Sequence, residues 1–406
     1  MPEHDIVVYG ATGFVGKLTA KYLADAAPES ARIALGGRSE AKLEQVRGEL
    51  GGRAADWPLV VADSSDAAAV GALAASAKVV ATTVGPYAKY GVPLVEACAA
   101  AGTHYADLTG EVLFMRKAID VAQAPATASG ARIVHTCGFD SIPSDIGVFL
   151  LAEHARENDL GELGDTKYVV VRMRGGPSGG TIDTLRSTVD TVKADKSVTR
   201  TLADPYALSP DRKAEPDLGS ERDTLKPTRD PELGWLAPFF MGSVNTRVVR
   251  RSNALLGYRY GRQLRYRELI GTGRGPVGAA KAAGIGGGVG SLFAGFALPG
   301  ARQLLDRVLP DPGEGPSPAA QDKGFFNIDI HTTTTTGAHL VCEIRVSGDP
   351  GYKATAVMLG ESALALALDD DKLPAAAGVL TPATAMGSVL VDRLRAAGHK
   401  YDVTQR

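Results

Sequence analysis

The chain of 406 residues has little cysteine, no metal-ligand motif and almost no net charge. Its three cysteines, Cys98, Cys137 and Cys342, are far apart and odd in number, which argues against a disulfide framework and for a reducing compartment. Neither a Cys-x-x-Cys nor a His-x-x-x-His pair occurs, so we expect no metal site. The formal net charge of −2 gives no reason to expect a nucleic-acid partner.

Two further absences narrow the class of protein. A basic segment followed by an apolar run is missing before the first predicted strand, so we expect no secretion signal and a cytoplasmic protein. No Tyr-x-x-x-Lys pair occurs, which disfavours a short-chain dehydrogenase, because that pair supplies the tyrosine acid of such enzymes. The length allows two or three domains with cores of their own.

What the sequence does contain begins with a glycine-rich turn, Gly10-Ala-Thr-Gly-Phe-Val-Gly16, between an apolar run at 5–9 and a helical pattern at 17–23. In a strand–turn–helix context, the first glycine permits the turn, the second admits a pyrophosphate, and the third lets helix and strand pack closely. The helix N-terminus offers free N–H groups to the phosphates. The predicted cofactor-binding residues of this turn are Gly10, Thr12, Gly13, Phe14, Val15 and Gly16.

The second predicted strand, at 31–35, leads to Arg38 and Ser39, where an acidic residue would select the ribose 2′-hydroxyl of NAD. An arginine matches a 2′-phosphate, so the sequence favours NADP. The third strand, at 58–62, ends at Asp63. Its carboxylate either accepts a hydrogen bond from the adenine amino group or caps the following helix, and the sequence leaves both readings open.

Later strand ends offer the remaining candidates. After the strand at 78–82, the backbone of Val84, Gly85 and Pro86 is predicted to lie against the nicotinamide, with the Tyr87 hydroxyl near the ring. The loops after the next two strands carry Asp107 and Asp140. These carboxylates are either site residues or helix caps, and capping is the commoner role.

These motifs together resemble one known family. The segments Thr83-Val-Gly-Pro-Tyr87, Tyr105-Ala-Asp-Leu-Thr-Gly-Glu111 and Cys137-Gly-Phe-Asp-Ser-Ile-Pro-Ser-Asp145, with the glycine turn, are similar to the saccharopine dehydrogenase-like oxidoreductases. More narrowly, the chain resembles the actinobacterial trans-acting enoyl reductase branch of this family. The segment Leu380-Thr-Pro-Ala-Thr-Ala-Met-Gly387 is part of that resemblance. The resemblance covers nearly the whole chain.

The resemblance implies an α/β fold, with a Rossmann-type doubly wound parallel sheet and a second α+β domain containing a mainly antiparallel sheet. We expect an NADP-binding domain at 1–150, a substrate or dimerisation domain at 151–348, and a C-terminal helical segment at 349–406 that returns to the first domain. The branch implies reduction of a carbon–carbon double bond in a lipid or polyketide-derived substrate.

For that reaction, the predicted catalytic residues are Tyr87 and Asp140, with the N–H groups of the helix start near Ser144 as a second source of hydrogen bonds. Implied partners are a lipid-like substrate, an acyl-carrier or polyketide synthase protein, and a second copy of the chain. Two alternatives stay open. One is a saccharopine-dehydrogenase-like amino-acid or imine dehydrogenase, and the other is a non-catalytic NADP-binding, lipid-associated protein.

Three segments of the middle region are harder to interpret. Residues 204–232 carry five prolines and are predicted to form a long loop. Residues 247–274 hold eight arginines and one acid, and their alternation from Arg259 to Arg267 predicts a strand with a solvated basic face. Docking of an acidic carrier protein or a phosphopantetheine group on this face is the alternative. Residues 282–299 have no charge but six glycines, so we predict a mobile apolar lid or a shallow, peripheral membrane contact rather than a stable helix.

Overall fold

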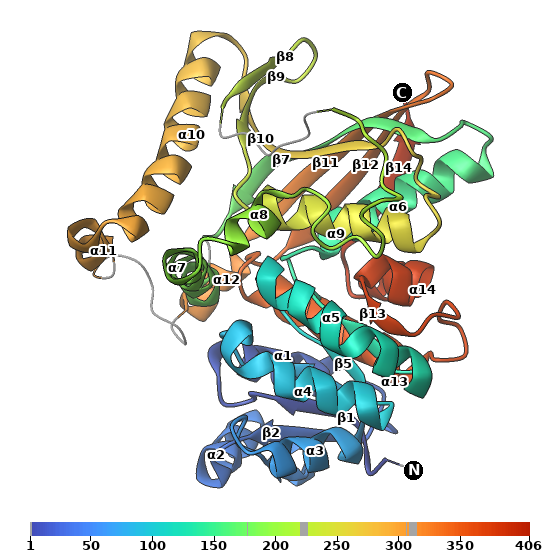
Figure 1. The fold of residues 1–406 in the computed structure, drawn as a ribbon. Coiled ribbons are helices and arrows are strands. Elements are labelled where there is room, and N and C mark those ends of the chain that lie inside the picture. Colours follow the sequence, from blue (N-terminus) through green and yellow to red (C-terminus); the bar gives the residue numbers. More distant parts are fainter. Residues whose placement is uncertain (1, 177, 220–225, 306, 308–314) are drawn as a thin grey trace. The chain divides into compact units, whose positions relative to one another are not determined.

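The computed structural model describes residues 2–176, 178–219, 226–305, 307 and 315–406. The chain forms two compact units, each built on a seven-stranded sheet (Figure 1). The first unit comprises Met1–Ile142, Gly313–Ser317 and Gly351–Gly398. The second comprises Pro143–Pro312, Pro318–Pro350 and His399–Arg406.

The first unit contains a parallel sheet with the strand order β13-β6-β5-β4-β1-β2-β3. Every neighbouring pair in it is parallel, which confirms the predicted Rossmann-type sheet. Its strands are β1 (His4–Tyr9), β2 (Ile33–Gly37), β3 (Leu59–Val61), β4 (Ala77–Thr82), β5 (His104–Ala106), β6 (Arg132–Val134) and β13 (Gly378–Leu380).

Helices cover both faces of this sheet. They are α1 (Phe14–Ala26), α2 (Glu40–Leu50), the 3₁₀ turn η1 (Gly52–Asp56), α3 (Ala67–Ser76), α4 (Tyr87–Ala101), α5 (Val112–Ser129), α13 (Lys353–Leu368) and α14 (Pro382–Ala396). The strand order reverses its direction between β3 and β4, and parallel crossovers are right-handed, so α1 and α2 lie on one face and α3, α4 and α5 on the other. Helix α13 packs against α1, where Tyr22 donates a hydrogen bond to Glu361.

The second unit contains a mixed sheet with the order β14-β12-β11-β7-β10-β9-β8. Only β7 and β10 pair in parallel, and the other neighbours are antiparallel, which confirms the predicted α+β architecture. Its strands are β7 (Leu163–Arg174), β8 (Thr228–Asp230), β9 (Gly234–Pro238), β10 (Arg265–Gly273), β11 (Phe325–Thr334), β12 (His339–Ser347) and β14 (Lys400–Gln405).

Helix α6 packs closely on this sheet, because a Cβ atom placed on Gly147 would lie 2.4 Å from Ile330 Cδ1. Residues on β11 alternate between buried and half-buried, the pattern of a sheet with one covered face. The helices are α6 (Ile142–Glu157), α7 (Gly179–Ala194), α8 (Val198–Ala203), α9 (Gly242–Leu255), α10 (Gly275–Ala297), α11 (Pro299–Leu305) and α12 (Pro318–Asp322).

The prediction that glycines keep 282–299 from forming a stable helix is wrong, since α10 runs through most of this stretch. Tertiary packing overrides the low helix propensity. Gly278 sits so close to β10 that a Cβ there would lie 2.4 Å from the Gly273 carbonyl oxygen. At the other end, Phe296 is fully buried, with the Arg186 guanidinium 5.7 Å from its ring centre. None of the helices in the described parts of the chain is long and apolar enough to cross a membrane.

The solvated basic face predicted around 259–267 is present on β10, where exposed Arg265 and Arg267 alternate with buried Tyr266 and Glu268. The arginines of α9, in the same arginine-rich stretch, are not part of this face. Arg247, Arg250 and Arg251 are buried. Each donates a hydrogen bond to a backbone carbonyl at or near the start of the predicted long loop: Leu202, Pro205 and Leu208, at 2.7, 3.4 and 2.6 Å. These guanidinium groups hold the chain at 202–208 against the helix. The predicted long loop itself ends in β8, and residues 220–225 of it lie outside the described residues.

Candidate functional site

The glycine turn after β1 has the shape that a pyrophosphate requires. Gly10 has φ +90°, and its N–H donates to the Gly36 carbonyl oxygen at 2.9 Å. A Cβ on Gly16 would lie 2.1 Å from the Gly10 carbonyl oxygen, so helix and turn are in direct contact there. At Gly13, which is exposed, a Cβ would meet only the Gly10 carbonyl oxygen at 3.3 Å. The turn is therefore packed on its inner side and open at Gly13.

Helix α1 begins at Phe14, so the N–H groups of its first turn point out of the helix end beside the open glycine. They carry the partial positive charge of the helix N-terminus, which suits a phosphate. The Phe14 ring packs edge-on against Tyr352 with centres 5.0 Å apart, so that side chain anchors the helix start. Thr12 and Val15 are half-buried at the same end. These residues fit the phosphate-binding role predicted for them.

Arg38 follows β2 and is exposed at the same edge of the sheet. Ser39 stands at the N-cap position of α2, yet its side chain makes no capping hydrogen bond. Asp63 accepts hydrogen bonds from the Ser65 N–H and hydroxyl at 2.8 and 2.6 Å. These bonds, and the charge of nearby Arg38, lower the pKa of Asp63. An exposed cation and an exposed carboxylate thus follow β2 and β3 at the same edge of the sheet.

The helix-cap reading of Asp63 is not supported. Helix α3 is capped by Asp66, whose carboxylate accepts from the N–H groups of Ala68 and Ala69 at 2.9 and 3.1 Å. Asp63 instead tightens the turn before that helix through Ser65. Its exposed carboxylate is left at the edge where a nucleotide base would lie.

The loop after β4 lies directly against the glycine turn. The Thr83 N–H donates to the Tyr9 carbonyl oxygen at 2.9 Å, and the Thr83 hydroxyl donates to the Gly10 carbonyl oxygen at 3.2 Å. A Cβ on Gly10 would lie 2.9 Å from Val84 Cγ2. Gly85 is exposed and Pro86 half-buried beside it. This contact places the predicted Val84–Pro86 backbone next to the phosphate-binding turn.

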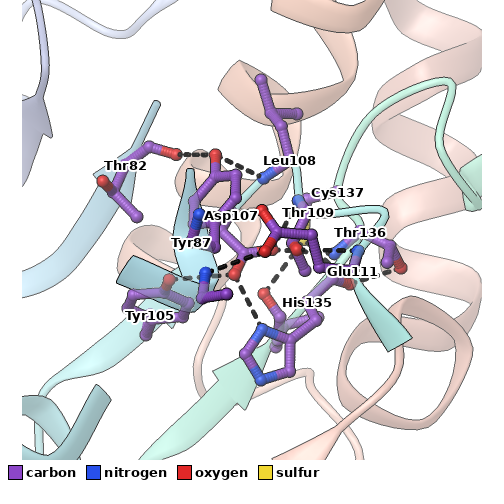
Figure 2. A network of polar contacts seen from close by, with 12 residues as sticks. Thr82, Tyr87, Tyr105, Asp107, Leu108, Thr109, Glu111, His135, Thr136 and Cys137 are labelled. Carbon is purple, nitrogen blue, oxygen red and sulfur yellow. Dashed lines mark hydrogen bonds and ion pairs between the residues drawn. The ribbon is translucent and has the colours of Figure 1, made fainter. Parts of the chain in front are cut away.

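Tyr87 is buried in the first unit, and its hydroxyl lies between Thr82 and Leu108 (Figure 2). It donates to the Thr82 carbonyl oxygen and accepts from the Leu108 N–H, both at 3.2 Å. Burial raises the pKa of Tyr87 well above its usual range. The hydroxyl thus joins the ends of β4 and β5, and its proton is directed at a backbone carbonyl.

Glu111 caps the N-terminus of α4 from a different loop, because the N-cap residue of that helix, Pro86, makes no capping hydrogen bond. Its two carboxylate oxygens accept from the N–H groups of Tyr87 and Ala88, each at 2.8 Å. The carboxylate faces a helix N-terminus, where negative charge is favoured. The loop after β5 is thereby fixed to the loop after β4.

Asp107 is fully buried, and its carboxylate contacts four hydrogen-bonding groups, so it joins neighbouring loops and does not cap a helix (Figure 2). One oxygen accepts from Tyr105 and lies 2.7 Å from His135 Nδ1, and the other accepts from the N–H groups of Thr109 and Thr136. Thr136 has φ +62°, a left-handed conformation that this hydrogen bond helps to hold. Asp107 therefore joins the loops after β5 and β6.

Asp140 stands on the loop after β6 and is half-buried. Its Oδ2 atom lies where a side chain on Gly138 would be, 2.7 Å from the position of a Cβ there. The loop is held in turn by Thr355, whose hydroxyl accepts from the Phe139 N–H at 3.0 Å. Burial, and then the charge of Asp107, raise the pKa of Asp140 to about 7. This carboxyl is thus a group that gives up a proton near neutral pH.

The site includes residues that the sequence analysis missed. Glu111, His135 and Thr136 take part in the network, although only Asp107 and Tyr87 were singled out there. Their position could have indicated this role. His135 and Thr136 directly follow β6, and Glu111 lies in the loop after β5, so all three are polar residues beyond the carboxyl end of an apolar strand. The described residues contain no cluster of side chains suited to a metal ion.

Comparison with known proteins agrees with this geometry. Residues 6–134 match the family of the saccharopine dehydrogenase NADP binding domain. A Mycobacterium tuberculosis protein assigned to the trans-acting enoyl reductases is 53% identical over 416 residues, covering 99% of this chain and 98% of the relative. A trans-acting enoyl reductase of Mycobacterium bovis is 49% identical over 407 residues, covering 98% and 96%.

A solved structure of saccharopine dehydrogenase from Saccharomyces cerevisiae has a similar fold, with a TM-score of 0.53 and 11% identity over 99% of both chains. The first unit is accordingly an NADP-binding domain, and its glycine turn and Arg38 fit that cofactor. The chain belongs to the trans-acting enoyl reductase family, a branch of the saccharopine dehydrogenase-like oxidoreductases that use NADP.

Proposed function

We propose that the protein reduces the carbon–carbon double bond of an enoyl thioester, with NADPH as reductant and Asp140 as the proton donor. The observation that carries this proposal is the Asp140 carboxyl, folded over Gly138 on the loop after β6. In a parallel sheet, that loop opens at the same edge as the glycine turn. The names of the two mycobacterial relatives support the reaction class.

The residues of the first unit divide the work. Gly13 and the first turn of α1 bind the pyrophosphate, Arg38 and Ser39 the 2′-phosphate, and the backbone of 84–86 the nicotinamide side. Bound NADPH supplies a hydride. Hydride addition to the β-carbon of a conjugated carbonyl leaves an enolate, and Asp140 then delivers its proton to the α-carbon, so the double bond gains one hydride and one proton. A proton from solvent restores the carboxyl.

Tyr87 has a different role in this proposal. Its hydroxyl proton is directed at the Thr82 carbonyl oxygen, so the residue positions the loops and does not touch the substrate. Asp107 likewise positions the Asp140 loop through the N–H of Thr136, and its buried negative charge favours the neutral form of Asp140. We assign the substrate-binding surface to the second unit and expect the acyl group to arrive on a carrier protein.

The alternative of an amino-acid dehydrogenase would call for cationic groups free to bind substrate carboxylates. The three arginines of α9 are buried and donate to backbone carbonyls, so they do not offer such a surface. The proposed function is tested with an enoyl thioester in D₂O and with NADPH deuterated at the transferred position. We expect cofactor deuterium at the β-carbon and solvent deuterium at the α-carbon, whereas no reduction of any enoyl thioester would contradict the proposal.

A further inference from the structure

Within the second unit, a hollow of about 440 Å³ opens between the end of β10 and the first half of α10. It is lined by Gly271 and Thr272 on the strand and by Lys281, Gly284 and Ile285 on the helix. Its walls are therefore mostly backbone and aliphatic side chain, with one cation. The site described above, in the first unit, does not include any of these residues.

Lys281 is the single charged residue of α10, whose other positions from 275 to 297 are uncharged. It is exposed, and among the residues that the structure describes, none lies within ion-pair distance of its ammonium group. The hydroxyl of Thr272 is engaged within the protein, since it lies 2.9 Å from the carbonyl oxygens of Trp235 and Gly278. A ligand in the hollow would thus find one point charge, on Lys281.

Gly284 contributes no side chain to the lining of the hollow and is itself exposed. A Cβ atom built there would meet no other atom within 4 Å, so a larger side chain would fill empty space instead of forcing the helix away. Gly271 offers the strand backbone opposite. Such a surface accepts an extended, uncharged chain that carries an anion at one end.

We propose that this hollow binds the phosphate end of a 4′-phosphopantetheine arm, with the phosphate on Lys281 and the uncharged arm along Gly284 and Ile285. A lysine is a point-charge partner for phosphate, and the arm is an extended chain without charge. The identity of this ligand rests on the proposed function, because a thioester substrate delivered by a carrier is attached to such an arm. The binding of the arm is nevertheless measurable without any turnover.

The experiment uses the full chain saturated with NADPH, so that phosphate ligands do not compete for the nucleotide site. Free 4′-phosphopantetheine, pantetheine and inorganic phosphate are titrated by calorimetry. We expect saturable binding of phosphopantetheine, with about tenfold weaker binding of pantetheine and still weaker binding of inorganic phosphate. Equal binding of phosphate and phosphopantetheine would show an anion site without an arm and would overturn the proposal.

Four variants locate the binding. Lys281→Met should weaken phosphopantetheine binding about tenfold and leave pantetheine binding unchanged, and Lys281→Arg should restore most of the loss. Gly284→Val should weaken both ligands by filling the hollow. Gly287→Val is the matched control, because Gly287 is exposed on the same helix, does not line the hollow, and its Cβ would also meet nothing within 4 Å. Unchanged affinity in Lys281→Met, or equal losses in Gly284→Val and Gly287→Val, would refute the site.

Turnover separates this inference from the proposed function. An enoyl thioester of pantetheine lacks the phosphate, so Lys281→Met should reduce it as the unaltered protein does. The enoyl thioester of phosphopantetheine should lose about tenfold in kcat/KM, through KM. If neither thioester is reduced but the phosphopantetheine titration behaves as expected, the hollow stands and the proposed function fails.

Discussion

The backbone N–H of Leu108 donates a hydrogen bond to the Tyr87 hydroxyl at 3.2 Å. Because the same hydroxyl donates to the Thr82 carbonyl oxygen, it has one donor and one acceptor within the protein. The tyrosine therefore closes a bridge between two loops that are far apart in sequence. With both hydrogen bonds made inside the protein, Tyr87 is expected to position these loops and not to donate a proton to the substrate. The two roles predict different effects of mutation on stability and on kcat.

Replacing Tyr87 with phenylalanine removes this bridge and leaves the Leu108 N–H and the Thr82 carbonyl in a buried place. We expect the free energy of unfolding to fall by about 1–3 kcal/mol, because unsatisfied buried groups carry that cost. The kcat for enoyl reduction should change by less than about threefold, whereas loss of a proton donor costs about 10² to 10⁴. Denaturant unfolding and steady-state kinetics measure the two effects, and a loss of that larger size would make Tyr87 catalytic.

Replacing Asp140 with asparagine keeps the shape of the side chain and removes the acid. We expect kcat to fall by about 10² to 10⁴ while the dissociation constant for NADPH stays the same. In the unaltered protein, kcat/KM should fall as pH rises through about 7, because the pKa of Asp140 is raised to about 7 and the protonated form is required. A pH profile that is the same in Asp140→Asn would exclude this carboxyl as the donor.

The same pKa shift predicts a change of stability with pH. An Asp whose pKa is raised on folding binds its proton more tightly in the folded state, so its ionisation disfavours folding. The free energy of unfolding of the unaltered protein, relative to Asp140→Asn, should therefore decrease as pH rises from about 4 to about 7. Chemical denaturation of both proteins across this range measures the difference, and a difference that grows with pH would contradict the shift.

Two glycines of the same turn should respond differently to substitution. Gly13→Val should abolish NADPH binding in a folded protein, because its Cβ meets only one atom at 3.3 Å and would project into the phosphate site. Gly16→Ala should instead lower stability by at least about 1–3 kcal/mol, since its Cβ would lie 2.1 Å from the Gly10 carbonyl oxygen. Circular dichroism and fluorescence titration separate the two results. Tight NADPH binding by Gly13→Val would mean that the turn is only structural.

Arg38→Ala should weaken NADPH binding on the order of tenfold and leave NADH binding unchanged, because only NADPH carries the 2′-phosphate. The expected loss of affinity is no larger because the Arg38 guanidinium is exposed, so solvent screens its interaction with the 2′-phosphate. Lys42→Ala on the same helix end is the control for loss of one positive charge. Equal affinities of the unaltered protein for NADPH and NADH would refute the assignment to Arg38.

The sequence was most informative where local chemistry dictates the backbone. The glycine turn, the parallel strands around it and the polar loops at their ends all follow from short motifs, and the structure confirms the predicted sheet. It was less informative for α10, where glycine suggested no helix. Contacts of Phe296 with Arg186 and Lys193, more than 100 residues earlier, stabilise the helix there, and they are invisible in the local pattern.

The roles of charged residues were the hardest to predict. The arginines of α9 belong to the same arginine-rich stretch as the exposed ones of β10, yet Arg247 and Arg251 are buried and donate to backbone carbonyls more than 40 residues earlier in the chain. Asp107 looks like a helix cap, but it gathers donors from two loops. The partners of the two arginines, and Thr136 for Asp107, lie far away in sequence, and their backbone groups carry no residue-specific signal.

Strand β13 pairs with β6 in parallel, with Gly378 beside Arg132, although most of the second unit is encoded between them. During synthesis, β6 is consequently an open sheet edge until residues 378–380 have left the ribosome. Unpaired edges promote association with other chains. The nascent protein therefore passes through a long period in which its nucleotide-binding sheet is incomplete and one sheet edge is open to association with other chains.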